Sequence, residues 1–369
     1  MHVCYIISDI DKAVFFEKTL MSLKDKKCSV SVILINGKNG QLHHFLIENN
    51  LDFFLLENEK ISTSFLNILK CRKFLKKIKP EIVHCHLAHA NWIGLISAKL
   101  SGVKKRIYTR HSGELIHKNW KEKIIDKIQN LVATDIVSIS KVIDDLLKKQ
   151  GVSDKKRILI HHGFELERFN NSNSEEANRI RKQYNPKNNY PTIGVIARWI
   201  EFKGIEYIVQ AFEKFIQEEK NAHLFLFGAD FNLSHSDEIL KALENIPKEN
   251  YSIIKFENNV FDLYHLFDIY VHVPINPFCE AFGQTYIEAL AAGVPSIFTL
   301  SGVATEVIVD KENAIAVPFM NHNAIFKAFI ELTSNDDLRE KLIANGKKMV
   351  NEKFQFETYL KKLIDLYEK

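Results

Sequence analysis

Two glutamates stand eight positions apart in the stretch EAFGQTYIEALAAGV, residues 280–294. Apolar residues recur at helical spacing between Gly283 and Gly293, which predicts a helix that stops at the second glycine. Glu280 then lies in the loop entering the helix and Glu288 lies inside it, on the order of 10 Å apart along the axis. That separation is too long for a shared proton and suits the two ends of one elongated ligand.

A second group of residues follows the apolar run TIGVIA, residues 192–197. Arg198 comes just past this predicted strand, and Lys203-Gly204 stands where the next helix begins. A helix N-terminus presents unpaired N–H groups and a partial positive charge, so it favours phosphate. Together with Arg198 and Lys203 it would place three cationic elements around one anion. The alternative is a solvated lysine and an ion-paired arginine on a surface loop.

Length and composition limit the classes of protein to consider. A chain of 369 residues suggests two domains, and 46% hydrophobic with 26% charged residues is typical of a soluble globular protein. The formal charge of +4 is too small to indicate a nucleic-acid partner. Five scattered cysteines without metal or redox spacing predict reduced thiols in the cytosol. No signal peptide precedes the first predicted strand, and no stretch is expected to span a membrane.

Short apolar runs alternate with helical segments along the whole chain. This pattern predicts an α/β fold with two doubly wound parallel-sheet, Rossmann-like domains, whose strand ends face each other across a cleft. The expected strands are residues 3–7, 29–35, 52–56, 81–85, 106–110, 135–140, 157–161, 192–197, 223–227, 252–256, 268–273, 295–299 and 314–317.

The domain boundary is predicted from a polar stretch. Residues 170–189, NNSNSEEANRIRKQYNPKNN, contain few large apolar residues and are interpreted as a linker. The first domain is then 1–169 and the second 190–354, followed by an amphipathic helix at 355–369 that can return to the first domain.

Taken together, these motifs resemble the retaining nucleotide-sugar glycosyltransferases of family 4 (glycosyl transferases group 1), which have the GT-B architecture. That family carries a Gly-Arg strand end, a Lys-Gly about five residues on, and two glutamates flanking seven residues that include Phe-Gly. The resemblance continues through LFLFG, DIYVHVP, GVPSIFT and SGVATEVI in the second half of the chain. In the first half it includes EIVHCHLAHA, IYTRHSGE, DIVSIS and ILIHHGFELERF, so it covers nearly the whole chain.

The resemblance implies roles at the nucleotide end of a donor. Arg198 and Lys203 would bind the diphosphate, and Glu288 would contact the ribose hydroxyls. The second domain would therefore bind the nucleotide sugar, with UDP the commonest nucleotide in the family. No metal and no cofactor beyond the donor are expected, because cations stabilise the leaving diphosphate.

At the sugar end, the resemblance implies that Glu280 lies beside the transferred sugar, assisted by backbone N–H groups near Phe282 and Gly283. His111, which follows the strand IYTR, would line the sugar site. The family generally lacks a clear enzymic nucleophile, and retention is often explained by same-face attack. The first domain would bind the acceptor, a glycan or lipid-linked glycan such as lipopolysaccharide.

Three positions depart from the family pattern. Ala197 replaces the glycine before the arginine, and His162-Gly163 replaces an Asn-Gly. The first strand leads into SDIDKAVFF, which has no glycine and places Asp9 and Asp11 where a glycine-rich turn normally approaches the diphosphate.

Other readings of the motifs remain open at this stage. Asp9-Ile10-Asp11 matches the metal-binding Asp-x-Asp of the other large glycosyltransferase fold, but a surface turn also explains it. A zinc hydrolase could use His84, His86 and His89, although Ala88 stands where those enzymes place an aspartate. A lectin-like relative that binds without transfer and a sugar-nucleotide 2-epimerase of the same architecture are further alternatives.

Residues 115–132, LIHKNWKEKIIDKIQNLV, predict an amphipathic helix. One face would carry Ile116, Trp120, Ile124, Ile128 and Leu131, while Lys118, Lys121, Lys123 and Lys127 outnumber Glu122 and Asp126. Basic amphipathic helices with a tryptophan lie at lipid interfaces, which suggests peripheral attachment to an anionic membrane at its inner face. The alternative is a helix that packs this face against its own domain.

Overall fold

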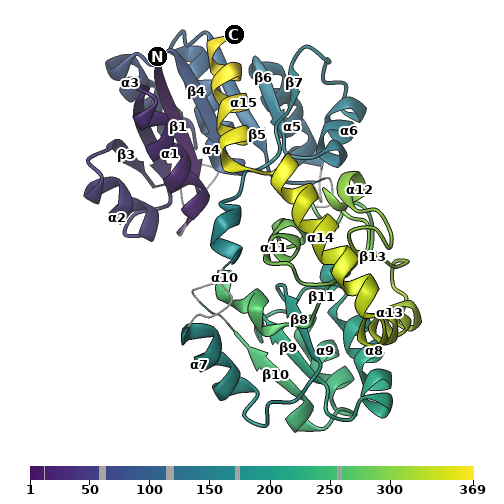
Figure 1. Ribbon diagram of the computed structural model, residues 1–369. Coiled ribbons are helices and arrows are strands. Elements are labelled where there is room, and N and C mark those ends of the chain that lie inside the picture. The colour runs from purple at the N-terminus through teal and green to yellow at the C-terminus, as the bar shows by residue number, and fades with distance from the viewer. Residues whose placement is uncertain (12, 58–63, 114–119, 171–174, 256, 258–259) are drawn as a thin grey trace. The chain divides into compact units, whose positions relative to one another are not determined.

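The structure is a computed structural model that describes residues 1–369 except 12, 58–63, 114–119, 171–174, 256 and 258–259 (Figure 1). The chain divides into two compact units. Unit 1 comprises Met1–His161 and Tyr359–Lys369, and unit 2 comprises His162–Thr358. Each unit contains one parallel sheet with helices, so the prediction of two doubly wound parallel sheets is confirmed.

The sheet of unit 1 has seven strands in the order β3-β2-β1-β4-β5-β6-β7, all parallel. Its strands are β1 (His2–Ser8), β2 (Ser29–Ile35), β3 (Asp52–Leu56), β4 (Ile82–His86), β5 (Lys105–Arg110), β6 (Asp135–Ser138) and β7 (Arg157–Leu159). Its helices are α1 (Val14–Asp25), α2 (Gln41–Glu48), α3 (Ser64–Ile78), α4 (Ala88–Leu100), α5 (Trp120–Val132) and α6 (Lys141–Lys149).

The strand order fixes which helices share a face of this sheet. From β1 to β3 the chain moves toward one edge, and from β4 to β7 it moves toward the other. Because parallel crossovers are right-handed, α1 and α2 cover one face, and α3 to α6 cover the opposite face. On that second face α4 packs against both α3 and α5.

The sheet of unit 2 has six parallel strands in the order β10-β9-β8-β11-β12-β13. Its strands are β8 (Thr192–Ile196), β9 (His223–Phe227), β10 (Tyr251–Ile254), β11 (Ile269–His272), β12 (Ser296–Phe298) and β13 (Ile315–Ala316). Its α-helices are α7 (Glu175–Tyr184), α8 (Ile205–Glu218), α9 (Ser236–Leu243), α10 (Val260–Leu263), α11 (Gln284–Ala292), α12 (Ala304–Val307), α13 (His322–Ser334) and α14 (Asp336–Lys353). Short 3₁₀ turns are η3 (Leu166–Asn170), η4 (Glu201–Lys203), η5 (Lys248–Asn250) and η6 (Tyr264–Leu266).

The boundary between the units falls earlier than the polar stretch 170–189. Residues from His162 onward belong to unit 2, where Phe169 packs on Phe261 with ring centroids 4.8 Å apart. Within the polar stretch, α7 forms and buries Ala177 and Ile180. Two polar contacts also tie this helix to unit 2. Arg181 donates to the carbonyl oxygen of His265 at 3.2 Å, and Arg179 forms an ion pair with Glu257 at 3.3 Å.

The last helix, α15 (Phe356–Glu368), begins in unit 2, and its residues from Tyr359 onward belong to unit 1. There the Tyr367 hydroxyl lies 2.7 Å from the Tyr5 hydroxyl and 2.6 Å from Nδ1 of His84. All three side chains are buried. A tyrosine at the end of the chain therefore satisfies two polar groups of the central strands β1 and β4.

No helix among the described residues is both long enough and apolar enough to cross a lipid bilayer.

We predict that Tyr367→Phe destabilises unit 1 by about 1–3 kcal/mol, because it leaves buried polar atoms of Tyr5 and His84 without this partner. Thermal and urea unfolding would measure the loss. Tyr190→Phe is the matched control, since its side chain is 60% exposed. Equal stability of the two variants would contradict the prediction.

Candidate active site

The loop after β8 places two basic residues at the carboxyl edge of the unit 2 sheet. Arg198 is exposed two residues beyond the strand, and its guanidinium has no hydrogen bond or ion pair with any residue that the structure describes. Lys203 ends the turn η4, and Gly204 caps the start of α8. The loop therefore carries an open arginine and a lysine fixed beside a helix N-terminus.

Gly204 explains how the lysine is held in place. Its φ is +64°, in the left-handed region, and an added Cβ would lie 2.3 Å from the carbonyl oxygen of Val273. Only glycine allows the backbone to approach the end of β11 this closely. The close approach brings Lys203 next to residues that follow β11.

Glu280 is the partner of that lysine. Its Oε1 accepts hydrogen bonds from Nζ of Lys203 and from Nε2 of His272, the latter at 2.8 Å. Its backbone N–H donates to Oγ of Ser301 at 3.0 Å. The side chain is only 11% exposed. Glu280 is thus held by three separate segments, which contribute Lys203, His272 and Ser301.

The electrostatics of this group favour an ionised carboxylate. Burial alone would raise the pKa of Glu280, but the hydrogen bond and charge of His272 and the charge of Lys203 lower it to about 2. Burial lowers the pKa of His272, and Glu280 opposes that shift. A carboxylate only accepts hydrogen bonds, so Nε2 of His272 carries its proton. At neutral pH Glu280 is therefore a carboxylate and His272 a neutral imidazole.

Helix α11 follows, as predicted, between Gly283 and Gly293. Gly283 is its N-cap, and no side chain caps the helix, so Glu280 does not serve that purpose. The N–H of Gly283 has no acceptor among the described residues. Phe282, by contrast, is buried, with its ring 5.0 Å from that of His162 and 6.0 Å from that of Phe164.

Glu288 lies within α11 and is half-buried. Its Oε2 accepts a hydrogen bond from the Tyr264 hydroxyl at 2.7 Å. Burial raises the pKa of Glu288, and the hydrogen bond from Tyr264 opposes that shift. The other oxygen, Oε1, has no partner among the residues described. Glu288 is therefore oriented by one bond and keeps one oxygen for a ligand.

In unit 1, His111 follows β5 and its Nε2 lies 3.1 Å from Nδ1 of His86. Burial lowers the pKa of His111 to about 4, so the imidazole is neutral at physiological pH. The ring also meets Phe16 edge-on, with centroids 6.3 Å apart. His111 is consequently a fixed neutral imidazole at the end of a central strand.

The other predicted histidines have separate partners. Both ring nitrogens of His84 are engaged, by the Tyr367 hydroxyl and by Oγ1 of Thr109 at 2.9 Å, and burial lowers its pKa to about 3. His89 lies 2.7 Å from Oδ2 of Asp9. A zinc ion bound by His84 would have to displace one of its two hydrogen bonds. Among the described residues no group of three or more His, Cys, Asp or Glu side chains is placed to hold a metal ion.

In the turn after β1, Asp9 and Asp11 both form hydrogen bonds with neighbouring residues of unit 1. Asp9 accepts a hydrogen bond from Nδ2 of Asn36 at 2.8 Å in addition to the contact with His89. Burial raises the pKa of Asp9, but the bonds from Asn36, His89 and Ser8 outweigh it and lower the pKa. Asp11 accepts from the N–H of Gln41, the first residue of α2, at 2.9 Å. These contacts are those of a structured surface turn.

Three residues of the site, His272, Ser301 and Tyr264, were not predicted from the sequence. His272 could have been noticed as a polar side chain closing an apolar strand. Ser301 and Tyr264 gave no signal, because their roles depend on which segments become neighbours in the fold.

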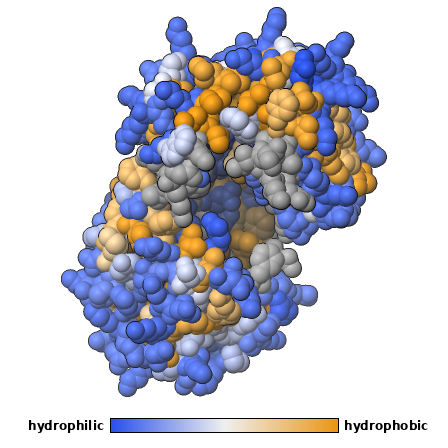
Figure 2. Space-filling model, turned by 180° about the vertical axis from the view of Figure 1, so that it is seen from behind, coloured by the Kyte–Doolittle hydropathy of each residue, from blue (hydrophilic) through white to orange (hydrophobic). Residues whose placement is uncertain are grey.

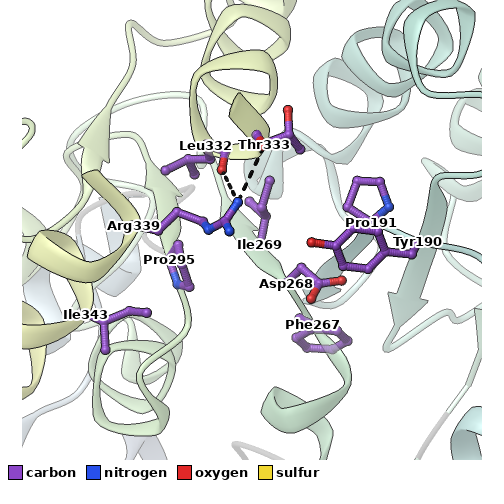
Figure 3. Close-up of a pocket in the computed structure, with 10 residues that line it drawn as sticks. All are labelled: Tyr190, Pro191, Phe267, Asp268, Ile269, Pro295, Leu332, Thr333, Arg339 and Ile343. Atoms are coloured by element: carbon purple, nitrogen blue, oxygen red, sulfur yellow. Dashed lines mark hydrogen bonds between the residues drawn. The ribbon is translucent and has the colours of Figure 1, made fainter. Parts of the chain in front are cut away.

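A pocket of about 220 Å³ in unit 2 lies at the opposite, amino-terminal edge of the sheet (Figure 3). Its two charged side chains bond to the protein itself. Arg339 donates to the carbonyl oxygen of Leu332 at 2.9 Å, and Asp268 accepts from the N–H of Thr192 at 2.7 Å. We assign this pocket no part in the chemistry.

Comparison with known proteins places the chain in a family. Residues 18–168 match the model described as Glycosyltransferase Family 4, and residues 176–349 match the model described as Glycosyl transferases group 1. The chain belongs to the group 1 glycosyltransferases. This confirms the family resemblance inferred from the sequence motifs.

Curated relatives of this glycosyltransferase align over most of its length. The capsular polysaccharide biosynthesis glycosyltransferase CapM of Staphylococcus aureus is 26% identical over 362 residues, covering 94% of this chain and 91% of the relative. The alpha-monoglucosyldiacylglycerol synthase of Acholeplasma laidlawii is 24% identical, covering 79% and 76% respectively.

Solved structures show the same fold. HepE from Anabaena, solved in complex with UDP, has a TM-score of 0.85 at 15% identity and covers 100% of both chains. A glycosyltransferase from Rickettsia africae has a TM-score of 0.84 at 21% identity, covering 100% of this chain and 97% of the other. The glycosyltransferase therefore has the predicted GT-B fold.

The lowered pKa of Glu280 predicts an acid-sensitive contribution to stability. Because its folded pKa is about 2 against an ordinary 4.5, this contribution is present above pH 4.5 and is lost as pH falls toward 2. It amounts to roughly 3 kcal/mol when complete. Glu280→Gln should therefore be less stable than the natural protein at pH 7, and the difference should shrink by pH 3. Exposed Glu201→Gln, from the neighbouring loop, is the control. A pH-independent difference would contradict the assignment.

Proposed function

We propose that this glycosyltransferase moves a hexose from a nucleoside-diphosphate sugar, with UDP as the nucleotide, to a glycan or lipid-linked acceptor. Transfer retains the configuration at the sugar carbon and needs no metal ion. The observation that carries the proposal is the ionised Glu280 held between Lys203 and His272, with Arg198 exposed after the neighbouring strand. The carboxyl edge of a doubly wound sheet is where such folds bind nucleotides.

The diphosphate of the donor would lie against Arg198, Lys203 and the first turn of α8. The guanidinium provides two parallel donors for phosphate oxygens, and the helix N-terminus adds a partial positive charge. As the bond to the sugar breaks, negative charge grows on the leaving diphosphate. Fixed cations stabilise that charge in the transition state without a metal.

The sugar would lie beside Glu280. Its carboxylate is ionised throughout the working pH range, so it favours a centre that becomes cationic during transfer. The N–H of Gly283 is available in the same loop for a sugar hydroxyl or a phosphate oxygen. We propose that His111 lines the sugar site as a neutral hydrogen-bonding group, consistent with its lowered pKa.

The ribose would be held by Glu288. A carboxylate that keeps one oxygen without a protein partner can accept hydrogen bonds from a ribose diol, while Tyr264 orients the other oxygen. Glu280 and Glu288 would then contact the two ends of one donor, which explains their spacing along the chain.

The relatives support the choice of donor and acceptor. HepE has been solved with UDP and with UDP-glucose. The names of the relatives from Staphylococcus aureus and Acholeplasma laidlawii refer to a capsular polysaccharide and to a glucosylated diacylglycerol. A polysaccharide or lipid-linked acceptor follows by analogy and is part of the proposal.

We also propose peripheral attachment to the inner face of an anionic membrane through the segment 115–132. Of this segment, residues 115–119 lie outside the described residues. In α5, Trp120 is 67%, Ile124 48% and Leu131 75% exposed. The alternative, a helix that buries this face against its own domain, predicts low exposure for these three side chains.

Substitutions of Glu288 and Glu280 should have different effects on donor binding and on turnover. Glu288→Ala removes hydrogen bonds to the ribose worth about 1.5–3 kcal/mol, so we expect weaker binding of donor and of free UDP. Glu280→Gln keeps the shape but removes a charge felt mainly in the transition state, so kcat should fall steeply while UDP affinity barely changes. Steady-state kinetics and UDP calorimetry measure both effects, with Glu201→Gln as the control.

Equal losses of UDP affinity with normal turnover in both variants would refute the role of Glu280. Analysis of the product settles the reaction itself. A glycosylated acceptor with retained configuration is expected, and an isomerised nucleotide sugar without transfer would indicate the epimerase instead.

Transfer should not depend on a metal ion, because the proposed diphosphate site is made of side-chain and helix cations. Activity after exhaustive treatment with a chelator, measured by product formation, should equal that of the untreated protein. Loss of activity that magnesium or zinc restores would contradict this and favour a metal role for the aspartate turn or the histidines.

A further inference from the structure

His272 is a polar side chain in the interior of unit 2. It is the last residue of β11 and is only 2% exposed. Figure 2 shows that hydrophilic residues make up much of the molecular surface, where water can satisfy their polar groups. A buried imidazole has no such solvent and needs a protein partner. Its Nε2 has one in Oε1 of Glu280, at 2.8 Å.

The alternation of side chains along β11 determines where His272 points. The neighbouring Val271 and Val273 belong to the buried core cluster that includes the apolar residues of α8. Successive residues of a strand point to opposite faces of the sheet, so His272 lies on the other face. There its ring meets the buried ring of Tyr286 in α11 edge-on, with centroids 4.9 Å apart.

Tyr286 is itself held in place. Its hydroxyl donates to the carbonyl oxygen of Thr299 at 3.0 Å, and the N–H of Thr299 donates to the carbonyl oxygen of His272 at 3.3 Å. A Cβ on Gly283 would lie 2.5 Å from the Tyr286 ring, so the glycine lets this ring lie against the loop that carries Glu280. The imidazole is therefore packed against a fixed ring and directed at the carboxylate.

Lys203 and His272 donate to the same oxygen of Glu280, but they are not equivalent. Nζ of a lysine can donate to more than one acceptor, so Lys203 can contact Glu280 and a diphosphate together. The neutral imidazole has a single N–H, and it is used on Glu280. The second oxygen, Oε2 of Glu280, has no partner among the described residues.

We propose that His272 is the positioning residue of Glu280 in the transfer reaction. It holds Oε1 while the diphosphate engages Lys203, and it leaves Oε2 for the sugar. A carboxylate that turned away or took up a proton would no longer favour a centre that becomes cationic. The inference rests on the proposed function for the place of the sugar, whereas the hold on the carboxylate does not depend on it.

The electrostatics of the site support this assignment. Titratable side chains that interact with Glu280 come from several elements of unit 2: His272, Lys203, Cys279, Tyr270 and Tyr286. Burial raises the pKa of Glu280, and the hydrogen bond from His272 is the largest influence that lowers it. Loss of the imidazole should therefore make Glu280 easier to protonate.

The test compares His272→Phe with His272→Gln in the full-length protein. Phenylalanine keeps a ring beside Tyr286 but has no N–H, whereas glutamine keeps an N–H donor. We expect kcat of His272→Phe to fall about tenfold or more, because a hydrogen bond to a charged group is lost. Its UDP affinity should stay within about twofold of the natural value. His272→Gln should recover most of the lost turnover.

The loss must act through Glu280. In the Glu280→Gln background, His272→Phe should lower kcat by less than about twofold further, since residues that act as a unit are not additive. The control is His223→Phe. This histidine is also 2% exposed and has partners for both ring nitrogens, but it begins β9 at the amino-terminal edge of the sheet. It should lower the melting temperature and leave kcat unchanged.

A titration without turnover separates this inference from the proposed function. NMR of isotope-labelled glutamate carboxyls follows Glu280, whose signal is assigned by its loss in Glu280→Gln. The carboxylate should protonate at a pH higher by about one unit or more in His272→Phe than in the natural protein. Equal midpoints, an unchanged kcat, or full additivity with Glu280→Gln would each overturn the inference. A raised midpoint in a protein that transfers no sugar would refute the proposed function and leave the hold on Glu280 standing.

Discussion

The carboxylate of Glu280, enclosed by Lys203 and His272, is the interaction on which the rest of unit 2 depends. A buried negative charge is costly unless it is paired and hydrogen-bonded. Here the pairing requires the loop after β8 and the end of β11 to meet within hydrogen-bonding distance. The sheet order β9-β8-β11-β12 makes those two strand ends neighbours. The positions of Lys203 and His272 in the candidate site are therefore those that keep the buried carboxylate of Glu280 ionised.

Close backbone approaches make this arrangement attainable. Gly302 sits against the Glu280 loop, and a Cβ on it would lie 2.6 Å from the carbonyl oxygen of Phe282. The N–H of Val303 donates to that same oxygen at 2.9 Å. The segment that supplies Ser301 to the N–H of Glu280 is thus in close contact with the loop at both Glu280 and Phe282. A side chain at Gly204 or Gly302 would push these segments apart and would move Lys203 away from Glu280.

Much of this could be predicted from the sequence, for identifiable reasons. Each of the thirteen predicted strands is present, because buried parallel strands are largely apolar runs such as 3–7 and 224–227. Helix α11 could be predicted because a glycine stands at each of its ends. The contact between Lys203 and Glu280 was not, since it depends on pairing β8 with β11 rather than with a sequence neighbour. Helix α7 was missed because only two of its side chains are buried.

In unit 1, the turn after β1 has aspartates where the family pattern has glycine. Asp9 has a φ of +54°, the conformation for which glycine is usual, and its carboxylate is satisfied by Asn36 and His89. Asp11 caps the start of α2 in the same turn. The carboxylates of Asp9 and Asp11 therefore already bond to neighbouring residues, and their negative charge would repel an anion at this turn. The side chains proposed to bind the diphosphate, Arg198 and Lys203, both belong to unit 2. Recognition of the donor's negative charge is consequently assigned to the unit that also holds Glu280 and Glu288.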